Sequence, residues 1–165
     1  MGSEGDLLIL HCNRNDIQHL IEYMTIAIDF DGTIVEHRYP RIGREIPFAI
    51  ETLKKLQKEN HRLILWSVRE GRLLDEAVQY CRERGLEFYA VNSNYAEETK
   101  ESQHYSRKLQ ADMFIDDRNV GGLSDWGTIY SMVHDKLTYE DIFRNMDYDE
   151  EPPAPQGFWQ RIFSK

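Results

Sequence analysis

The chain has 165 residues, of which 29 are acidic and 20 are basic, so its formal net charge is −9 with neutral histidines. A domain of this length buries roughly 70% of the surface that its unfolded chain exposes, which excludes the mini-proteins that depend on disulfides or a structural metal. The sequence pI near 5.1 and the scattered basic residues argue against a protein that binds a nucleic acid duplex.

The amino-terminal third of the chain predicts a leader, a strand, a loop and a helix. Residues 1–23 are mixed in character up to an abrupt apolar stretch, and we interpret them as a leader or appended segment. Thr25–Ile28 is apolar, partly β-branched and followed by Asp29, which is typical of a buried strand that ends at a polar loop. A loop or hairpin over 34–46 leads to a helix with Pro47 in its first turn. The expected buried face of that helix consists of Ala49, Ile50, Leu53 and Leu56.

The middle of the chain alternates between predicted strands and helices. The predicted elements are a strand over 62–68, a helix over 73–84 that stops at Gly85, a strand over 88–91, a helix over 102–110 and a strand over 113–115. This alternation is typical of an α/β fold with a doubly wound, three-layer α/β/α parallel sheet, in which helices cover both faces. Such Rossmann-like folds bind ligands outside the carboxyl ends of their strands. Polar residues at those strand ends are therefore candidates for function.

The carboxyl-terminal part predicts one more helix and then a tail. Ser124 is the expected cap of a helix that carries Trp126, and we interpret Trp66 and Trp126 as core residues. Residues 149–165 contain an acidic and proline-rich linker followed by an aromatic segment. The sequence thus predicts one domain over 24–148, flanked by the leader and the tail.

The cysteines and the hydropathy of the chain indicate its compartment. Cys12 and Cys81 lie 69 positions apart and belong to no metal-ligand pattern, so we expect two reduced thiols. We find neither a secretory signal nor a run of the ~18 apolar residues that a membrane span needs. We expect a soluble cytoplasmic protein without a membrane span.

A short acidic motif follows the first predicted strand. It reads Asp29, Phe30, Asp31, Gly32, Thr33. Because side chains two residues apart in an extended segment point the same way, both carboxylates should face one pocket while Phe30 turns into the core. Gly32 allows a tight turn and a close approach of the backbone to a ligand.

Further polar residues lie at the ends of the other predicted strands. Ser67 follows the second strand, Lys108 precedes the strand over 113–115, and Asp116 and Asp117 follow it. A doubly wound sheet brings these positions together. Converging carboxylates repel one another unless a cation joins them, and an all-oxygen site suits Mg²⁺ together with a substrate phosphate. The pattern therefore predicts a site that binds Mg²⁺ together with a phosphorylated substrate.

These motifs, in this order, resemble those of the haloacid dehalogenase (HAD) superfamily of phosphohydrolases. The resemblance spans roughly residues 25–133 and implies a Mg²⁺-dependent phosphatase that works through an aspartyl-phosphate. It gives Asp29 the role of nucleophile, Asp31 that of general acid and base, and Ser67 and Lys108 that of phosphate-binding groups. It also implies that the metal is held by the Asp29 side chain, the Asp31 backbone carbonyl and Asp116, with Asp117 in the same or the next shell.

The remaining candidates concern the substrate. Gly32, Thr33, Arg69 and Asn92 are expected substrate contacts because they lie in the motif or at strand ends. Ser67 lies 34 positions after Thr33, and Lys108 lies 41 positions after Ser67, which leaves too few residues for a cap domain. The chain thus resembles the capless subclass of the superfamily, whose substrates are small molecules or macromolecules and in which a homo-oligomer can close the cleft.

Two other functions fit the same residues. The first is a phospho-ligand-binding or phosphoaspartate signalling module without turnover, although Asp31 beside the nucleophile argues against a long-lived acyl phosphate. The second is a metal-dependent nuclease, which the missing basic surface disfavours. The sequence itself names no physiological substrate.

Overall fold

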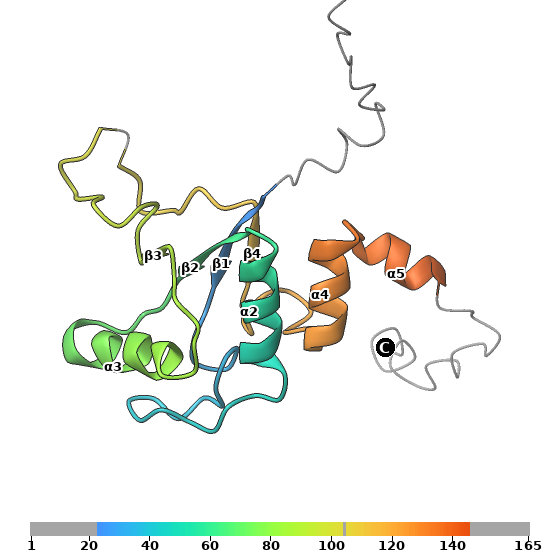
Figure 1. The fold of residues 1–165 in the computed structure, drawn as a ribbon, viewed down its shortest axis with the longest axis horizontal. Helices are drawn as coiled ribbons and strands as arrows, with labels where there is room; N and C mark the ends of the chain where they lie inside the picture. The colour runs from blue at the N-terminus through green and yellow to red at the C-terminus, as the bar shows by residue number, and fades with distance from the viewer. Residues whose placement is uncertain (1–22, 104, 146–165) are drawn as a thin grey trace, which may run out of the picture.

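The computed structural model describes residues 23–103 and 105–145 (Figure 1). The expected tail over 149–165 and all but the last residue of the leader over 1–23 lie outside the described residues. The elements in chain order are β1 Thr25–Ile28, α2 Ala49–Lys58, β2 Arg62–Leu65, α3 Gly71–Arg82, β3 Ala90–Val91, β4 Met113–Ile115, α4 Trp126–His134 and α5 Tyr139–Asn145. The strands expected over 62–68 and 88–91 are shorter than predicted, whereas β1 and β4 have the predicted bounds.

The four strands form one all-parallel sheet in the order β3-β2-β1-β4, so the chain has an α/β, Rossmann-like fold. The chain first moves from β1 through β2 to β3 and then returns to place β4 on the other side of β1. The direction of winding therefore switches between β1 and β4. In parallel sheets of this kind the crevice at the switch point is the usual place for a ligand.

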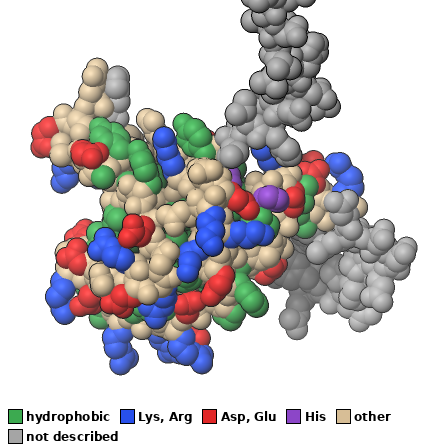
Figure 2. Space-filling view, viewed as in Figure 1, with side chains coloured by type: hydrophobic (Ala, Val, Ile, Leu, Met, Phe, Trp, Pro, Cys, Tyr) green, Lys and Arg blue, Asp and Glu red, His purple; other side chains and the backbone are tan. Residues whose placement is uncertain are grey.

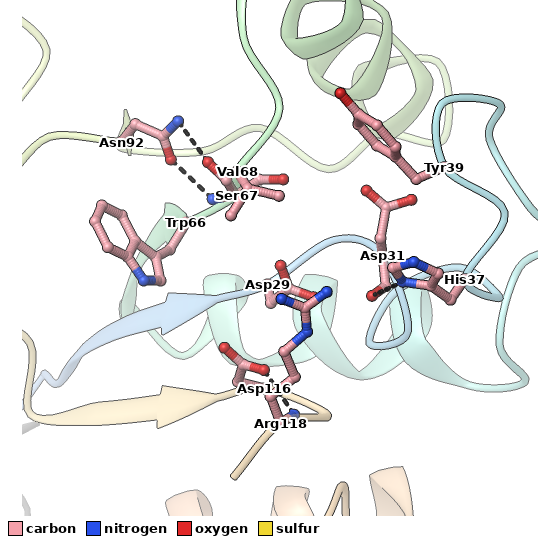
Figure 3. A pocket seen from close by; sticks show the side chains of 10 residues that line it. All are labelled: Asp29, Asp31, His37, Tyr39, Trp66, Ser67, Val68, Asn92, Asp116 and Arg118. Carbon is pink, nitrogen blue, oxygen red and sulfur yellow. Dashed lines mark hydrogen bonds between the residues drawn. The ribbon is translucent and has the colours of Figure 1, made fainter.

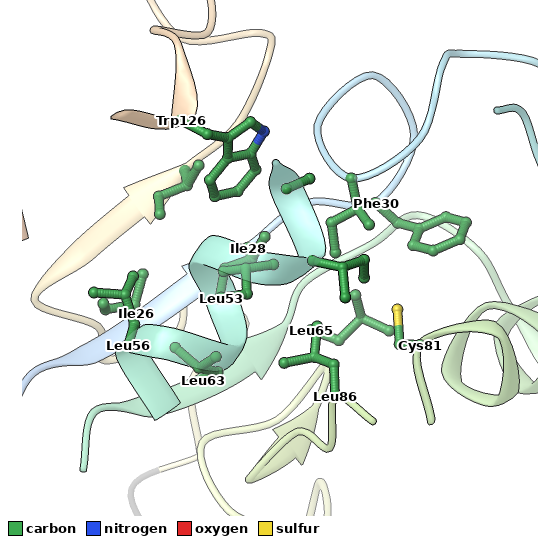
Figure 4. Close-up of a cluster of buried hydrophobic side chains, with 14 of the residues drawn as sticks. Ile26, Ile28, Phe30, Leu53, Leu56, Leu63, Leu65, Cys81, Leu86 and Trp126 are labelled. Atoms are coloured by element: carbon green, nitrogen blue, oxygen red, sulfur yellow. The ribbon is translucent and has the colours of Figure 1, made fainter. Parts of the chain in front are cut away.

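One face of the sheet carries the main core, and helices cover it (Figure 4). The buried face of α2 consists of Ala49, Ile50, Leu53 and Leu56, as predicted from their helical spacing. Ile26 and Ile28 of β1 alternate with residues that face the opposite side, and they belong to the same apolar cluster as Ala77 and Cys81 of α3. Phe30 is fully buried there too, as predicted.

The opposite face of the sheet is covered by a chain segment without a helix. Its small cluster joins Ala27 and Ile64 of the sheet to Leu109, with Ala111 packed against it. The helix expected over 102–110 is wrong, because its described residues form turns and irregular structure. Among the described residues of that stretch only Leu109 is buried, so they present no apolar helical face to dock. Among the described residues, the helices of the main core lie on one face of the sheet, and the small cluster on the other face contains no helical residue. The expected three-layer arrangement, with helices on both faces, is therefore not shown.

The two carboxyl-terminal helices also differ from the prediction. Asp125, not Ser124, caps α4, because its side chain accepts the backbone N–H groups of Gly127 and Thr128. The helix α5 was not expected, although its signal is present in the sequence. Thr138 and Asp141 exchange side chain to backbone hydrogen bonds at its start, in the manner of a capping box.

Three features of the described residues bear on the composition arguments: surface charge, helix length and Cys81. Lys and Arg side chains are interspersed with Asp and Glu over the face drawn in Figure 2. No helix among the described residues is both long and apolar enough to span a membrane. Cys81 is free and buried, and burial raises its pKa to about 12. It is therefore a packing residue and not a reactive thiol.

Candidate active site

A cavity of about 440 Å³ lies at the carboxyl edge of the sheet (Figure 3). Every strand contributes to its wall through the residues that directly follow the strand. The lining residues are Asp29, Asp31, His37, Tyr39, Trp66, Ser67, Val68, Asn92, Asp116 and Arg118. The parallel topology thus brings together Asp29, Asp31, Ser67 and Asp116, as the motif positions predict.

Three carboxylates form what we call the acid cluster: Asp29, Asp116 and Asp117. One ligand atom from each lies within 4.8 Å of the others. Asp29 follows β1 and Asp116 follows β4, and the Asp29 N–H still donates to the Ile115 carbonyl at 3.0 Å, so the sheet itself sets their spacing. The pKa of Asp29 is raised from its ordinary 3.8 to about 6. Burial is the main cause and the neighbouring Asp116 and Asp117 charges add to it, while hydrogen bonds from the Phe30 backbone and the Thr33 hydroxyl act in the opposite direction.

Thr33 and Gly32 shape the acid cluster from behind the cavity wall and do not line the cavity. The fully buried Thr33 hydroxyl donates to Asp29 Oδ2 at 3.3 Å and accepts the Asp117 N–H at 3.1 Å. Gly32 has φ +104°, and a Cβ atom there would collide with the Asp117 carboxylate. Both were expected as substrate contacts, but neither lines the cavity. The close backbone approach that Gly32 permits is to Asp117.

The acid cluster fits a divalent cation. Asp117 Oδ1 is buried and has no hydrogen-bond partner among the described residues. A buried carboxylate oxygen without a partner is costly, and the three neighbouring carboxylates repel one another, so a bound cation would relieve both effects. An oxygen-only ligand set is the set that Mg²⁺ prefers. The backbone carbonyl of Asp31, expected as a further ligand, contacts His37 Nδ1 at 3.1 Å.

Asp31 lies in a different electrostatic setting, because its carboxylate pairs with Arg69. Nε of Arg69 donates to one oxygen at 2.6 Å and Nη2 to the other at 2.7 Å. The same guanidinium donates to the backbone carbonyls of Pro40 and Arg41, both at 3.0 Å. Arg69 is fully buried. It was expected as a substrate contact, and it instead fixes Asp31 and the loop over 34–46.

Ser67 is positioned by Asn92, which follows β3. The Asn92 side chain accepts the Ser67 N–H and donates to the Ser67 carbonyl, each at 2.8 Å. These two bonds hold the turn after β2 against the end of β3. Asn92 lines the cavity, so a substrate contact there stays a prediction.

Lys108 does not line the cavity. Its side chain is exposed, in the irregular segment that replaces the predicted helix. Sequence reasoning in turn missed Arg118, which lines the cavity one position after the acid cluster. Trp66, interpreted as a core residue, is half-buried and forms part of the cavity wall. The position of Arg118 directly after two strand-end acids was the signal that could have found it.

The comparisons with known proteins identify a relative of known structure. No family model matches the chain, and no curated protein matches it. A solved structure of a conserved protein from Bacteroides thetaiotaomicron is 71% identical, covers 73% of this chain and 98% of its own, and has a TM-score of 0.70. Identity at this level over nearly the whole of the solved chain shows common descent. The chain therefore belongs to the same family as this conserved Bacteroides thetaiotaomicron protein.

Proposed function

We propose that the protein is a Mg²⁺-dependent phosphatase, a hydrolase of phosphoric monoesters that resembles the capless members of the HAD superfamily. The observation that carries this proposal is the acid cluster at the switch point, with its partnerless buried oxygen on Asp117. The cavity of about 440 Å³ suits a small molecule or the phosphorylated end of a larger one. A cytoplasmic location and closure of the cleft by a homo-oligomer stay predictions.

Asp29 is the proposed nucleophile. When bound by Asp29, Asp116 and Asp117, the metal would supply positive charge that offsets repulsion between the Asp29 carboxylate and the phosphoryl dianion. An Asp29 oxygen forms a bond to phosphorus while the bond from phosphorus to the ester oxygen breaks. The product is an aspartyl-phosphate on Asp29 and a free alcohol.

Asp31 is the proposed general acid and base. It gives a proton to the departing ester oxygen in the first step. In the second step it takes a proton from the water whose oxygen bonds to phosphorus, and the bond from phosphorus to Asp29 breaks. A carboxylate offers about four lone-pair directions, and the two bonds from Arg69 use two of them. Lone-pair directions therefore remain on Asp31 through which it would exchange the proton in the proposed steps.

The Ser67 turn completes the proposed site. Asn92 fixes the backbone of Ser67 at the cavity wall, which holds its hydroxyl near an incoming phosphoryl group. A positioned hydroxyl stabilises the equatorial oxygens of the transition state.

The test is hydrolysis of p-nitrophenyl phosphate by the full-length protein, with Mg²⁺ and with a chelator. We expect activity that requires the metal and is lost in Asp29→Asn. Asp75→Asn is the matched control, because it makes the same charge change on the exposed surface of α3, outside the cavity. Asp29→Asn with wild-type activity would refute the assignment.

A second candidate function is a phospho-ligand-binding or phosphoaspartate module without turnover. The observation that favours it is the Arg69 ion pair, which engages both oxygens of Asp31. Binding of beryllofluoride together with the absence of hydrolysis over sugar, nucleotide, lipid and peptide phosphates would support this function over the first.

A further inference from the structure

The charge at the cavity is too negative to bind a phosphate without a further positive group. The acid cluster contributes three carboxylates, and a divalent cation there would leave one negative charge before a dianionic phosphoryl group arrives. The resemblance assigns the additional cation to Lys108, which is exposed and does not line the cavity. Another positive group is therefore needed beside Asp29.

Arg69 does not supply that charge. Its guanidinium is fully buried and is occupied by the Asp31 carboxylate and two backbone carbonyls. Its positive charge is already paired with the negative charge of Asp31. A ligand that reached it would have to displace that carboxylate.

Arg118 is in the right place and has a free head group. Among the described residues that line the cavity, it is the one Lys or Arg side chain. Its backbone N–H donates to Asp116 Oδ1 at 2.8 Å, which fixes the turn after β4. Figure 3 shows its side chain extending past Asp116 toward Asp29. Its guanidinium forms no ion pair or hydrogen bond with the residues that the structure describes.

We propose that Arg118 binds the phosphoryl group of the substrate, in the role that the resemblance gives to Lys108. The inference rests on the proposed phosphatase function. A guanidinium presents two parallel N–H donors to two phosphate oxygens, so it holds a phosphoryl group in one orientation as well as neutralising it. The side chain reaches the cavity from the turn after β4.

The experiment compares Arg118→Ala, Arg118→Lys and Lys108→Ala in the full-length protein, with Arg72→Ala as the control. Arg72 is an exposed residue of α3 that pairs with Glu76 outside the cavity. The readouts are KM and kcat for p-nitrophenyl phosphate, and calorimetric binding of inorganic phosphate in the presence of Mg²⁺. We expect Arg118→Ala to weaken phosphate binding and raise KM about 10- to 100-fold, the usual range for a charged hydrogen bond.

The variants separate this inference from its rivals. Arg118→Lys should recover part of the lost affinity because it restores the charge without the two parallel donors. Mg²⁺ binding should be retained in Arg118→Ala, which shows that the acid cluster is intact. A larger loss of phosphate binding in Lys108→Ala than in Arg118→Ala would overturn the inference, as would wild-type phosphate binding in Arg118→Ala.

The direct phosphate titration also distinguishes failure of the inference from failure of the proposed function. If the wild-type protein hydrolyses no ester but binds phosphate through Arg118, the inference holds and the phosphatase function fails. If the protein hydrolyses esters and Arg118→Ala leaves both KM and phosphate binding unchanged, the function holds and the inference fails. Absence of phosphate binding by the wild-type protein would overturn the inference.

Discussion

Asp29 and Asp31 are two residues apart and line the same cavity, yet they lie in opposite electrostatic settings. Asp29 lies among two other carboxylates, and burial raises its pKa to about 6. Asp31 has both oxygens paired with the buried guanidinium of Arg69. The acid cluster is thus a concentration of unneutralised negative charge, and the Arg69–Asp31 pair is neutral in itself.

This difference indicates what each region does. A partly buried group of like charges destabilises a fold, so its assembly from two separate segments, the ends of β1 and β4, points to a cation and to function. The ion pair instead has a structural task, because Arg69 also binds the carbonyls of Pro40 and Arg41. It attaches the loop over 34–46 to the turn after β2 and holds one wall of the cavity. Charge removal should therefore affect activity without unfolding the protein in the first region, whereas in the second it should lower stability as well as disturb Asp31.

The largest expected effect is the loss of hydrolysis in Asp29→Asn. The amide cannot attack phosphorus, so the rate should fall on the order of 10⁴-fold or more while the fold persists. Steady-state assays of p-nitrophenyl phosphate with Mg²⁺ measure the rate, and circular dichroism verifies the fold. Unfolding of this variant at room temperature would contradict the division between the two regions.

The next effect is a loss of stability in Arg69→Met. Removing one partner leaves the Asp31 charge buried and unpaired, which should lower the free energy of unfolding by about 3–5 kcal/mol. Urea denaturation measures the change. Arg44→Ala is the matched control, because the Arg44–Glu36 pair is exposed and should change stability little. Equal midpoints for the two variants would show that the buried pair has no structural role.

The pH dependence of stability should also separate the regions. In the metal-free protein the folded state holds the Asp29 proton more tightly than the unfolded state, since the pKa rises from 3.8 to about 6. Stability should therefore fall as the pH rises from about 4 through about 6 and level off above that window. As the pH rises across this range, the melting temperature of the wild type should fall, whereas that of Asp29→Asn should fall less. A constant difference between them would place the cause elsewhere.

The smallest expected effect is that of Thr33→Val. The substitution removes the hydroxyl that joins Asp29 to the Asp117 N–H and should cost about 1–2 kcal/mol of stability, because that N–H is left unpaired. Thr33→Ser keeps the hydroxyl and should lose less. Denaturant midpoints compare the two. A larger loss in the serine variant would show that the methyl group, not the hydroxyl, matters.

The sequence predicts well the features that depend on local pattern. Strands β1 and β4 have their predicted bounds because each is an apolar run that ends at an aspartate. The buried face of α2 follows from helical spacing alone. The acid cluster follows from the topology, since parallel strands place their carboxyl ends at one edge.

The features that depend on long-range side-chain contacts were not predictable in this way. Nothing in the local sequence shows that Arg69 reaches Asp31, 38 positions earlier in the chain. Lys108 and Arg118 are both basic residues near β4 in the sequence. The chain before β4 leaves Lys108 outside the cavity wall, whereas Arg118 in the turn after β4 is part of it.

Calorimetric titration of Mg²⁺ into the full-length protein tests the central claim most directly. The acid cluster should bind one ion, and Asp116→Asn should abolish or greatly weaken that binding because it removes one ligand charge from the three. Asp75→Asn should bind Mg²⁺ as the wild type does. Equal binding by wild type and Asp116→Asn, or no binding by the wild type, would contradict the assignment of the acid cluster as a metal site.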